Sequence, residues 1–132
     1  MKKVLLWLWQ LPQNLLGWFL SIFADKKHNY ICNDGKEYRI YFMSLFGSGV
    51  SLGNYIIFDT AYKTYIAILD ISVKHEHGHQ KQSMYLGPLY LIVIGIPSVL
   101  GNIYSRLFHK DSEWYYKQPW EAWADKLGGV VR

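Results

Sequence analysis

The segment His75-Glu76-His77-Gly78-His79 contains the pattern H-E-x-x-H, and the interpretation of the whole chain starts from it. Residues four positions apart lie on one face of an α-helix, so His75 and His79 would point their imidazole rings the same way. Two imidazole nitrogens placed in this way can bind one metal ion. We therefore expect this segment to be helical and to carry part of a metal site.

Two other residues of the segment support this interpretation. Glu76 stands about 100° round the helix from His75, so it could act as a base on a metal-bound water without being a ligand. Gly78 is unusual, because a glycine inside a helix costs up to about 1 kcal/mol relative to alanine. We expect its missing side chain to make room for close packing behind the histidines, in a helix from about residue 72 to residue 83.

A second short segment places the carboxylates of Glu121 and Asp125 four residues apart, on one face of a predicted helix from residue 120 to residue 127. Pro119 suits the start of this helix, and Gly128-Gly129 suits its end. The alternative interpretation is that both carboxylates are solvated charges on an amphipathic helix.

Together the two segments resemble the gluzincins, the metallopeptidase group that includes thermolysin and the integral-membrane peptidases that process prenylated proteins. The glycine before the second histidine and the Ala-Asp pair at the end of the second segment are similar to the membrane branch in particular. The resemblance covers about residues 70–83 and 119–129. It implies hydrolysis of peptide bonds with Zn²⁺ as cofactor.

The resemblance also implies a role for each residue of the two motifs. His75, His79 and Glu121 would bind zinc, with Glu76 as the general base on zinc-bound water. Asp125 would hold the ring of His75 in orientation and make it more basic.

A gluzincin also needs a side chain that steadies the oxyanion, and no obvious downstream segment supplies it here. The candidates are Tyr115, Tyr116 and Arg132. For each of them a structural or solvent-exposed role is the simpler interpretation.

The composition suits one domain with a hydrophobic core, since the 132 residues are 51% hydrophobic and 17% aromatic. The net charge of +4 is compatible with an ordinary basic surface or with attraction to anionic lipid head groups. The basic residues are scattered without a nucleic-acid motif, so no nucleic-acid partner is expected. The single cysteine, Cys32, excludes an internal disulfide and a thiolate zinc cluster.

The stretch from Val4 to Ala24 holds 21 uncharged residues, which is long enough to span a bilayer. Four residues that suit an apolar span poorly interrupt it: Gln10, Pro12, Gln13 and Asn14. We favour a membrane-anchoring or interfacial segment. A signal peptide and a buried helix of the domain are the alternatives.

A second uncharged stretch runs from Met84 to Ser105. The candidate ligands His79 and Glu121 flank it, so a single crossing of a bilayer would place them on opposite sides. The stretch must therefore return, as a re-entrant hairpin or as a buried helical pair. Pro97 is the expected position of the break.

The middle of the chain has strand and turn signals. Apolar side chains alternate from Glu37 to Phe42, which predicts a half-buried strand. Asn33-Asp34-Gly35 and Gly47-Ser48-Gly49 predict turns on either side of it. With short strands expected at Asn29 to Cys32 and Val50 to Phe58, the sequence predicts an antiparallel meander of about three strands.

These predictions combine into an α+β fold, in which a small antiparallel sheet packs on the H-E-x-x-H helix and a second helix brings Glu121. Residues 1–27 would form an apolar membrane-associated segment, and residues 28–132 a compact domain similar to zinc metallopeptidases. We expect a membrane-associated protein whose partners are a lipid bilayer and a peptide or protein substrate. An open strand edge could bind that substrate.

Two other functions remain open. The chain could be a membrane-associated zinc-binding interaction protein without turnover, or a membrane scaffold without a metal. Detection of peptide cleavage would separate the first from the enzyme, and zinc analysis would separate the second.

Overall fold

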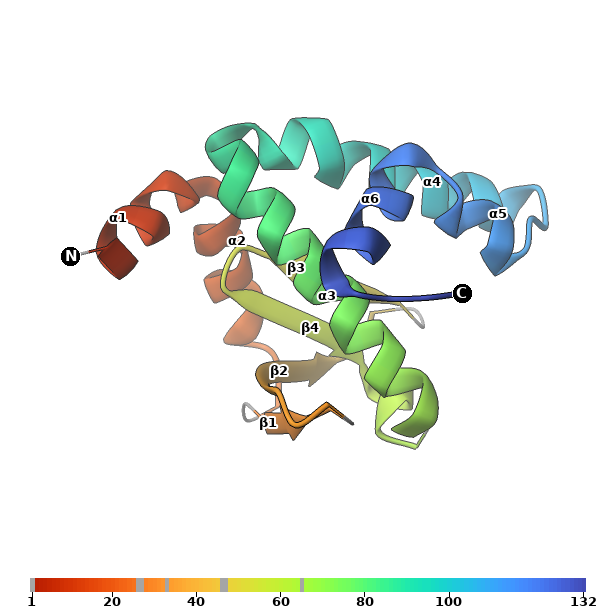
Figure 1. Ribbon diagram of the computed structural model, residues 1–132, viewed down its shortest axis with the longest axis horizontal. Helices are drawn as coiled ribbons and strands as arrows, with labels where there is room; N and C mark the ends of the chain where they lie inside the picture. Colours follow the sequence, from red (N-terminus) through yellow and green to blue (C-terminus); the bar gives the residue numbers. More distant parts are fainter. Residues whose placement is uncertain (1, 26–27, 33, 46–47, 65) are drawn as a thin grey trace.

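The computed structural model describes residues 2–25, 28–32, 34–45, 48–64 and 66–132, and these form an α+β fold (Figure 1). The strands are β1 (His28–Ile31), β2 (Glu37–Met43), β3 (Gly49–Leu52) and β4 (Tyr55–Asp59). The longer helices are α1 (Lys2–Trp9), α2 (Leu11–Ser21), α3 (Ile66–Leu86), α4 (Ile96–Leu107) and α6 (Pro119–Gly128). The shorter elements are η1 (Thr60–Lys63), η2 (Gly87–Leu89), the π-helical η3 (Leu91–Gly95) and α5 (Ser112–Tyr116). Figure 1 shows α3 crossing in front of the sheet, with α6 beside it.

The sheet is mixed, which corrects the predicted antiparallel meander. Its strand order is β1-β2-β4-β3, and the central pair β2 and β4 is parallel. The predicted strand from Val50 to Phe58 is in fact the hairpin of β3 and β4, because Gly53 turns the chain with a φ of +63°. β3 is therefore an edge strand. Of the predicted turns, Asn33 and Gly47 lie outside the described residues.

The core lies between the sheet and α3. Ile40 and Phe42 of β2 and Phe58 of β4 are buried against Leu69 and Val73 of α3. The predicted inward alternation of β2 is thus confirmed, and the burial of these apolar side chains fixes α3 across the sheet.

The polar interruption of the first apolar stretch joins the N-terminal helices to α3. The Gln13 amide donates hydrogen bonds to Ser83 Oγ (2.8 Å) and to the Gly87 carbonyl oxygen (2.8 Å). The Ser83 hydroxyl in turn donates to Gln10 Oε1 at 2.6 Å. Gln10 and Gln13 are both buried, so these bonds hold the junction of α1 and α2 against the end of α3.

In the described part of the chain, no single helix has the length and apolar character needed to cross a membrane. One pair of helical segments, Ile68–Leu89 and Leu91–Leu107, has them together, but this pair is bent by 120°. The break lies between Leu89 and Leu91, shortly after Gly87 with its φ of +56°, and not at Pro97 as predicted. Pro97 instead occupies the first turn of α4, where a proline costs no hydrogen bond.

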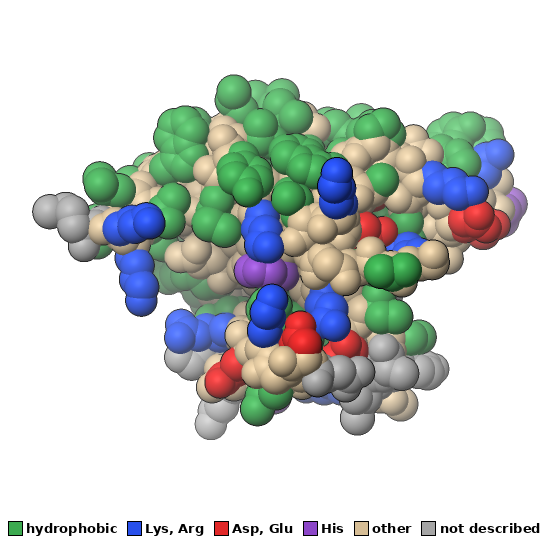
Figure 2. Space-filling model, viewed as in Figure 1, with side chains coloured by type: hydrophobic (Ala, Val, Ile, Leu, Met, Phe, Trp, Pro, Cys, Tyr) green, Lys and Arg blue, Asp and Glu red, His purple; other side chains and the backbone are tan. Residues whose placement is uncertain are grey.

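Large apolar side chains are exposed along one side of the molecule. Figure 2 shows them gathered over α1 and over the segment from η2 to α4. This apolar face includes Leu5, Leu8, Trp9, Leu89, Ile92, Ile96, Val99, Leu100, Ile103 and Leu107. An exposed apolar surface of this kind is a candidate interaction site.

Candidate metal centre

Three side chains that can bind a metal ion converge in the interior, between α3 and α6. Glu121 Oε2 lies 2.9 Å from His75 Nε2 and 3.1 Å from His79 Nε2. Two atoms that each bind one zinc ion at about 2.1 Å with tetrahedral geometry lie about 3.4 Å apart. All three residues are buried, and the spacing of their ligand atoms fits a metal ion with small adjustments.

The close packing of the two helices determines this convergence. A Cβ atom at Gly78 would lie 1.8 Å from the Ala124 carbonyl oxygen, and one at Gly128 would lie 2.0 Å from the Lys74 carbonyl oxygen. Only glycine fits at both places, so the backbones of α3 and α6 approach closely. Gly129 then ends α6 with a left-handed φ of 75°, as the sequence predicts.

Each histidine is oriented through its Nδ1 atom. His75 Nδ1 donates to Asp125 Oδ1 at 2.7 Å, and His79 Nδ1 donates to Gln82 Oε1 at 2.6 Å. The Gln82 amide is itself fixed, because its Nε2 atom donates to the Trp120 carbonyl oxygen. Both Nε2 atoms are thereby turned toward Glu121, and this arrangement of outer partners is typical of metal-binding histidines.

Glu121 is oriented in the same way. Its Oε1 atom accepts hydrogen bonds from Ser98 Oγ and from the Tyr115 hydroxyl (3.0 Å). These two partners occupy one carboxylate oxygen and leave Oε2 to the histidines. The carboxylate is therefore suited to bind a metal ion through one oxygen.

The cluster requires a positive charge at its centre. Two neutral imidazoles with protons on Nδ1 would turn lone pairs toward the Glu121 carboxylate, which also carries only lone pairs. Burial lowers the pKa of His75, but its hydrogen bonds to Asp125 and Glu121 outweigh burial and raise the pKa to about 9. Burial raises the pKa of Glu121, yet the two histidines hold it well below its usual range. Either a proton on a histidine or a bound metal cation would supply this charge.

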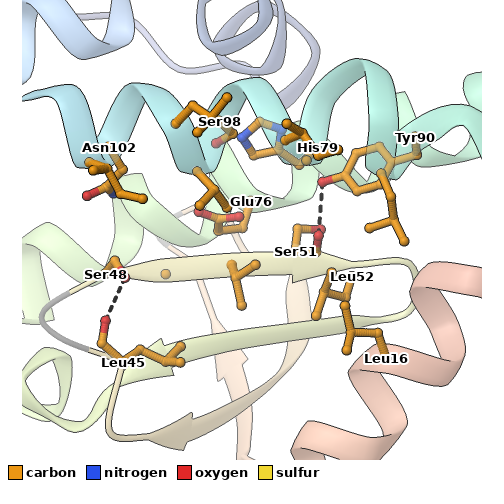
Figure 3. A pocket seen from close by; sticks show the side chains of 18 of the residues that line it. Leu16, Leu45, Ser48, Ser51, Leu52, Glu76, His79, Tyr90, Ser98 and Asn102 are labelled. Atoms are coloured by element: carbon orange, nitrogen blue, oxygen red, sulfur yellow. Dashed lines mark hydrogen bonds between the residues drawn. The ribbon is translucent and has the colours of Figure 1, made fainter.

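Glu76 lies next to this cluster but outside it. It is buried, and its Oε2 atom has no hydrogen-bond partner among the described residues. Burial raises the pKa of its carboxyl group, although the neighbouring histidines oppose this effect. Figure 3 shows Glu76 pointing into the space between α4 and β3, with His79 and Ser98 beside it.

Two cavities adjoin Glu76. The larger has a volume of about 810 Å³ and is also lined by His79, Ser98 and Tyr115. The smaller, of about 230 Å³, is lined by His75, Tyr115 and other residues of α5 and η1. A water molecule or a substrate carbonyl in either cavity would therefore lie near Glu76.

The three oxyanion candidates have different positions. Tyr115 lines both cavities with Glu76, and its hydroxyl is hydrogen-bonded to Glu121 of the cluster. Tyr116 packs its ring edge-on against His75, with a centroid distance of 5.0 Å. Arg132 binds Asp125 with two nitrogens (2.7 and 3.1 Å) and covers the Tyr116 ring, so its role is structural.

Sequence reasoning did not identify Gln82 and Ser98. Gln82 follows His79 by three residues, which is the spacing of neighbours on a helix face, so this signal was present. Ser98 had no signal, because its contact with Glu121 depends on the bend after Gly87.

Comparisons of the chain with protein-family models, with curated proteins and with solved structures found no match. The buried cluster itself contains residues of both sequence motifs, His75 and His79 from the first and Glu121 from the second.

Proposed function

We propose that the chain is a small zinc-dependent metallopeptidase that works at a membrane surface. The observation that carries this proposal is the buried cluster of His75, His79 and Glu121, with the unpartnered carboxylate oxygen of Glu76 beside it. The gluzincin resemblance of the two motifs points the same way.

The donor set supports zinc over calcium and magnesium. Two histidine nitrogens and one glutamate oxygen form the ligand set of several zinc peptidases, and they leave a fourth position open. Calcium and magnesium prefer oxygen ligands alone. A zinc ion held there would act as a Lewis acid on a carbonyl group and would lower the pKa of a bound water.

The protein side chains would divide the remaining work. Among the described residues, Glu76 is the only carboxylate that lines the larger cavity, so it would accept a proton from water and later donate it to the leaving amine. Asp125 and Gln82 would keep the histidine rings in orientation. Tyr115 lies at the cavity wall, and burial raises the pKa of its hydroxyl, which keeps it protonated. To steady an oxyanion, this hydroxyl would have to exchange its hydrogen bond to Glu121 for one to the substrate.

The edge strand β3 offers a place for a peptide main chain. The Ser51 carbonyl oxygen accepts a hydrogen bond from the Tyr90 hydroxyl at 2.9 Å, which shows that it points away from β4. Main-chain groups alternate in direction along a strand, so Gly49 turns the same way, next to Glu76. An extended peptide could therefore pair with β3 at Gly49, beside the proposed base.

Membrane association is supported by the exposed apolar face and its charge. The elements that form this face carry Lys2, Lys3 and Arg106 but no acidic residue. This sign suits a bilayer that contains anionic lipids. The polar residues around the histidine helix support a position of the site near the surface of such a bilayer.

The test is hydrolysis of a mixed peptide library by the full chain, with and without added zinc, analysed by mass spectrometry. We expect cleavage that requires zinc and that falls at least a hundredfold in Glu76→Gln, which keeps the shape of the side chain and removes the base. The variant should still bind zinc. Cleavage at the wild-type rate by Glu76→Gln would refute its role as the base, and zinc binding without any cleavage would favour the interaction protein.

A further inference from the structure

The larger cavity beside Glu76 has mainly aliphatic walls. Leu16 of α2, Leu52 of β3, Leu91 of η3 and Val99 of α4 line it from four different elements. Its volume of about 810 Å³ is in the range of sites for whole ligands and exceeds the space that one water or one side chain needs. It is therefore large enough for several apolar groups of one bound molecule.

The cavity opens onto the apolar face of the molecule. Ile96, Val99 and Ile103 line the cavity, and they are also 53%, 55% and 49% exposed. The same side chains thus belong to the cavity wall and to the exposed apolar face. A molecule that lies against the apolar face can reach Glu76 without crossing a polar surface.

The wall also contains polar atoms without partners. Glu76 Oε2 and Ser51 Oγ are both buried and have no hydrogen-bond partner among the described residues. Both residues line the cavity, and so does Gly49. A hydrocarbon chain could not satisfy these atoms, whereas the amide groups of a peptide could.

We infer that this cavity binds the bulky aliphatic side chains of an extended peptide segment that reaches it from a membrane surface. Hydrolysis of that segment depends on the proposed peptidase function, but its binding in the cavity does not. The selected substrate is a polypeptide with aliphatic side chains on either side of the cleaved bond, next to a bilayer.

One glycine of the cavity wall allows a sharp test. Gly95 ends η3, and a Cβ atom there would lie 3.5 Å from its nearest neighbour, Leu91 Cδ2, which is ordinary van der Waals contact. An alanine therefore fits without change. A leucine at this position would extend into the cavity and fill part of it, far from the backbone contacts between α3 and α6.

The probe is a leucine- and threonine-rich peptide that contains one photo-leucine and continues into a transmembrane helix. It is reconstituted in vesicles of phosphatidylcholine and phosphatidylglycerol and irradiated with the full chain, and the cross-links are mapped by mass spectrometry. We expect cross-links on cavity residues such as Leu91 and Leu16. The yield should fall at least tenfold in Gly95→Leu and stay within threefold in Gly95→Ala.

Two further arms complete the experiment. When serine replaces leucine in the same peptide, the cross-linking yield should fall at least tenfold. Zinc content and thermal unfolding of both Gly95 variants should match the wild type, which shows that the fold is intact. The readout does not require zinc or hydrolysis, so it can succeed where the peptidase proposal fails.

Three outcomes would overturn the inference. The first is cross-linking only to outer residues such as Ile92. The second is an unchanged yield in a folded Gly95→Leu variant. The third is that a phospholipid with a photoreactive acyl chain labels the cavity and displaces the peptide, which would make the cavity a lipid site.

Discussion

Gly78 of α3 and Ala124 of α6 are in direct backbone contact, so that a Cβ atom at position 78 would lie 1.8 Å from the Ala124 carbonyl oxygen. This contact confirms the close packing that the glycine predicts. It also fixes the distance between the helix that carries His75 and His79 and the helix that carries Glu121. The distances between the three side chains thus depend on the absence of a Cβ atom at Gly78 and, on the other helix, at Gly128.

Gly78→Ala should therefore separate the helices. We expect a loss of about 2 kcal/mol or more in the free energy of unfolding, because the clash is with backbone and cannot be relieved by a rotamer change. Zinc affinity should fall as well. Urea denaturation and zinc titration measure the two effects. Gly95→Ala is the matched control, since the added methyl group there meets only ordinary contacts; equal stability of the two variants would contradict the argument.

The carboxylates of α6 should differ in their effect on zinc. Glu121→Ala removes a proposed ligand and should nearly abolish binding. Asp125→Ala removes only the partner of His75 and should weaken affinity about 10–100-fold. Competition with a chelating dye measures both. Glu113→Ala, which removes an exposed carboxylate paired with Lys117, should have no effect. If Glu121→Ala also had none, the assignment of the third ligand would fail.

Arg132 should act on the metal site through Asp125. Its two hydrogen bonds hold the carboxylate that holds His75, so Arg132→Met should lower zinc affinity by a smaller factor than Asp125→Ala. In the Asp125→Ala background the same change should add almost nothing, because the shared partner is gone. Arg39→Met, at an exposed position of β2, is the control. Independent, additive effects of the two changes would show that Arg132 does not work through Asp125.

Membrane binding should depend on the charge beside the apolar face. Lys2→Glu with Lys3→Glu should weaken sedimentation with phosphatidylglycerol vesicles at least tenfold, since each lysine near an anionic surface contributes about 1 kcal/mol. Lys36→Glu with Arg39→Glu changes the charge equally near β2, on the sheet side of the molecule (Figure 1), and should matter less. Equal losses for both pairs would indicate non-specific attraction. Deletion of residues 1–27 is a poorer test, because it also removes the buried hydrogen bonds that Gln13 donates to Ser83 and Gly87.

Local patterns predicted much of this fold. The spacing of His75 and His79 predicted a helix that includes both, and Pro119 with Gly129 predicted the ends of α6, because these signals act within a few residues. The alternation in β2 identified Ile40 and Phe42 as core residues. Each of these features is recorded in neighbouring positions of the sequence.

Other features depend on residues far apart in the chain. The parallel pairing of β2 with β4 follows from a turn at Gly53 that splits one apolar run in two. Gln13 interrupts an apolar stretch, and its partner Ser83 is 70 positions away. The contact of Ser98 with Glu121 likewise requires the bend after Gly87. No local pattern identifies such partners, since they meet only when the helices are packed.

Zinc content measures the central claim most directly. The full chain should be purified without a metal-chelating resin, dialysed against metal-free buffer and analysed by inductively coupled plasma mass spectrometry. The cluster of His75, His79 and Glu121 predicts about one zinc per chain, because three buried ligands converge on one position. A folded protein with a zinc content near zero, which also takes up none on titration, would contradict the account.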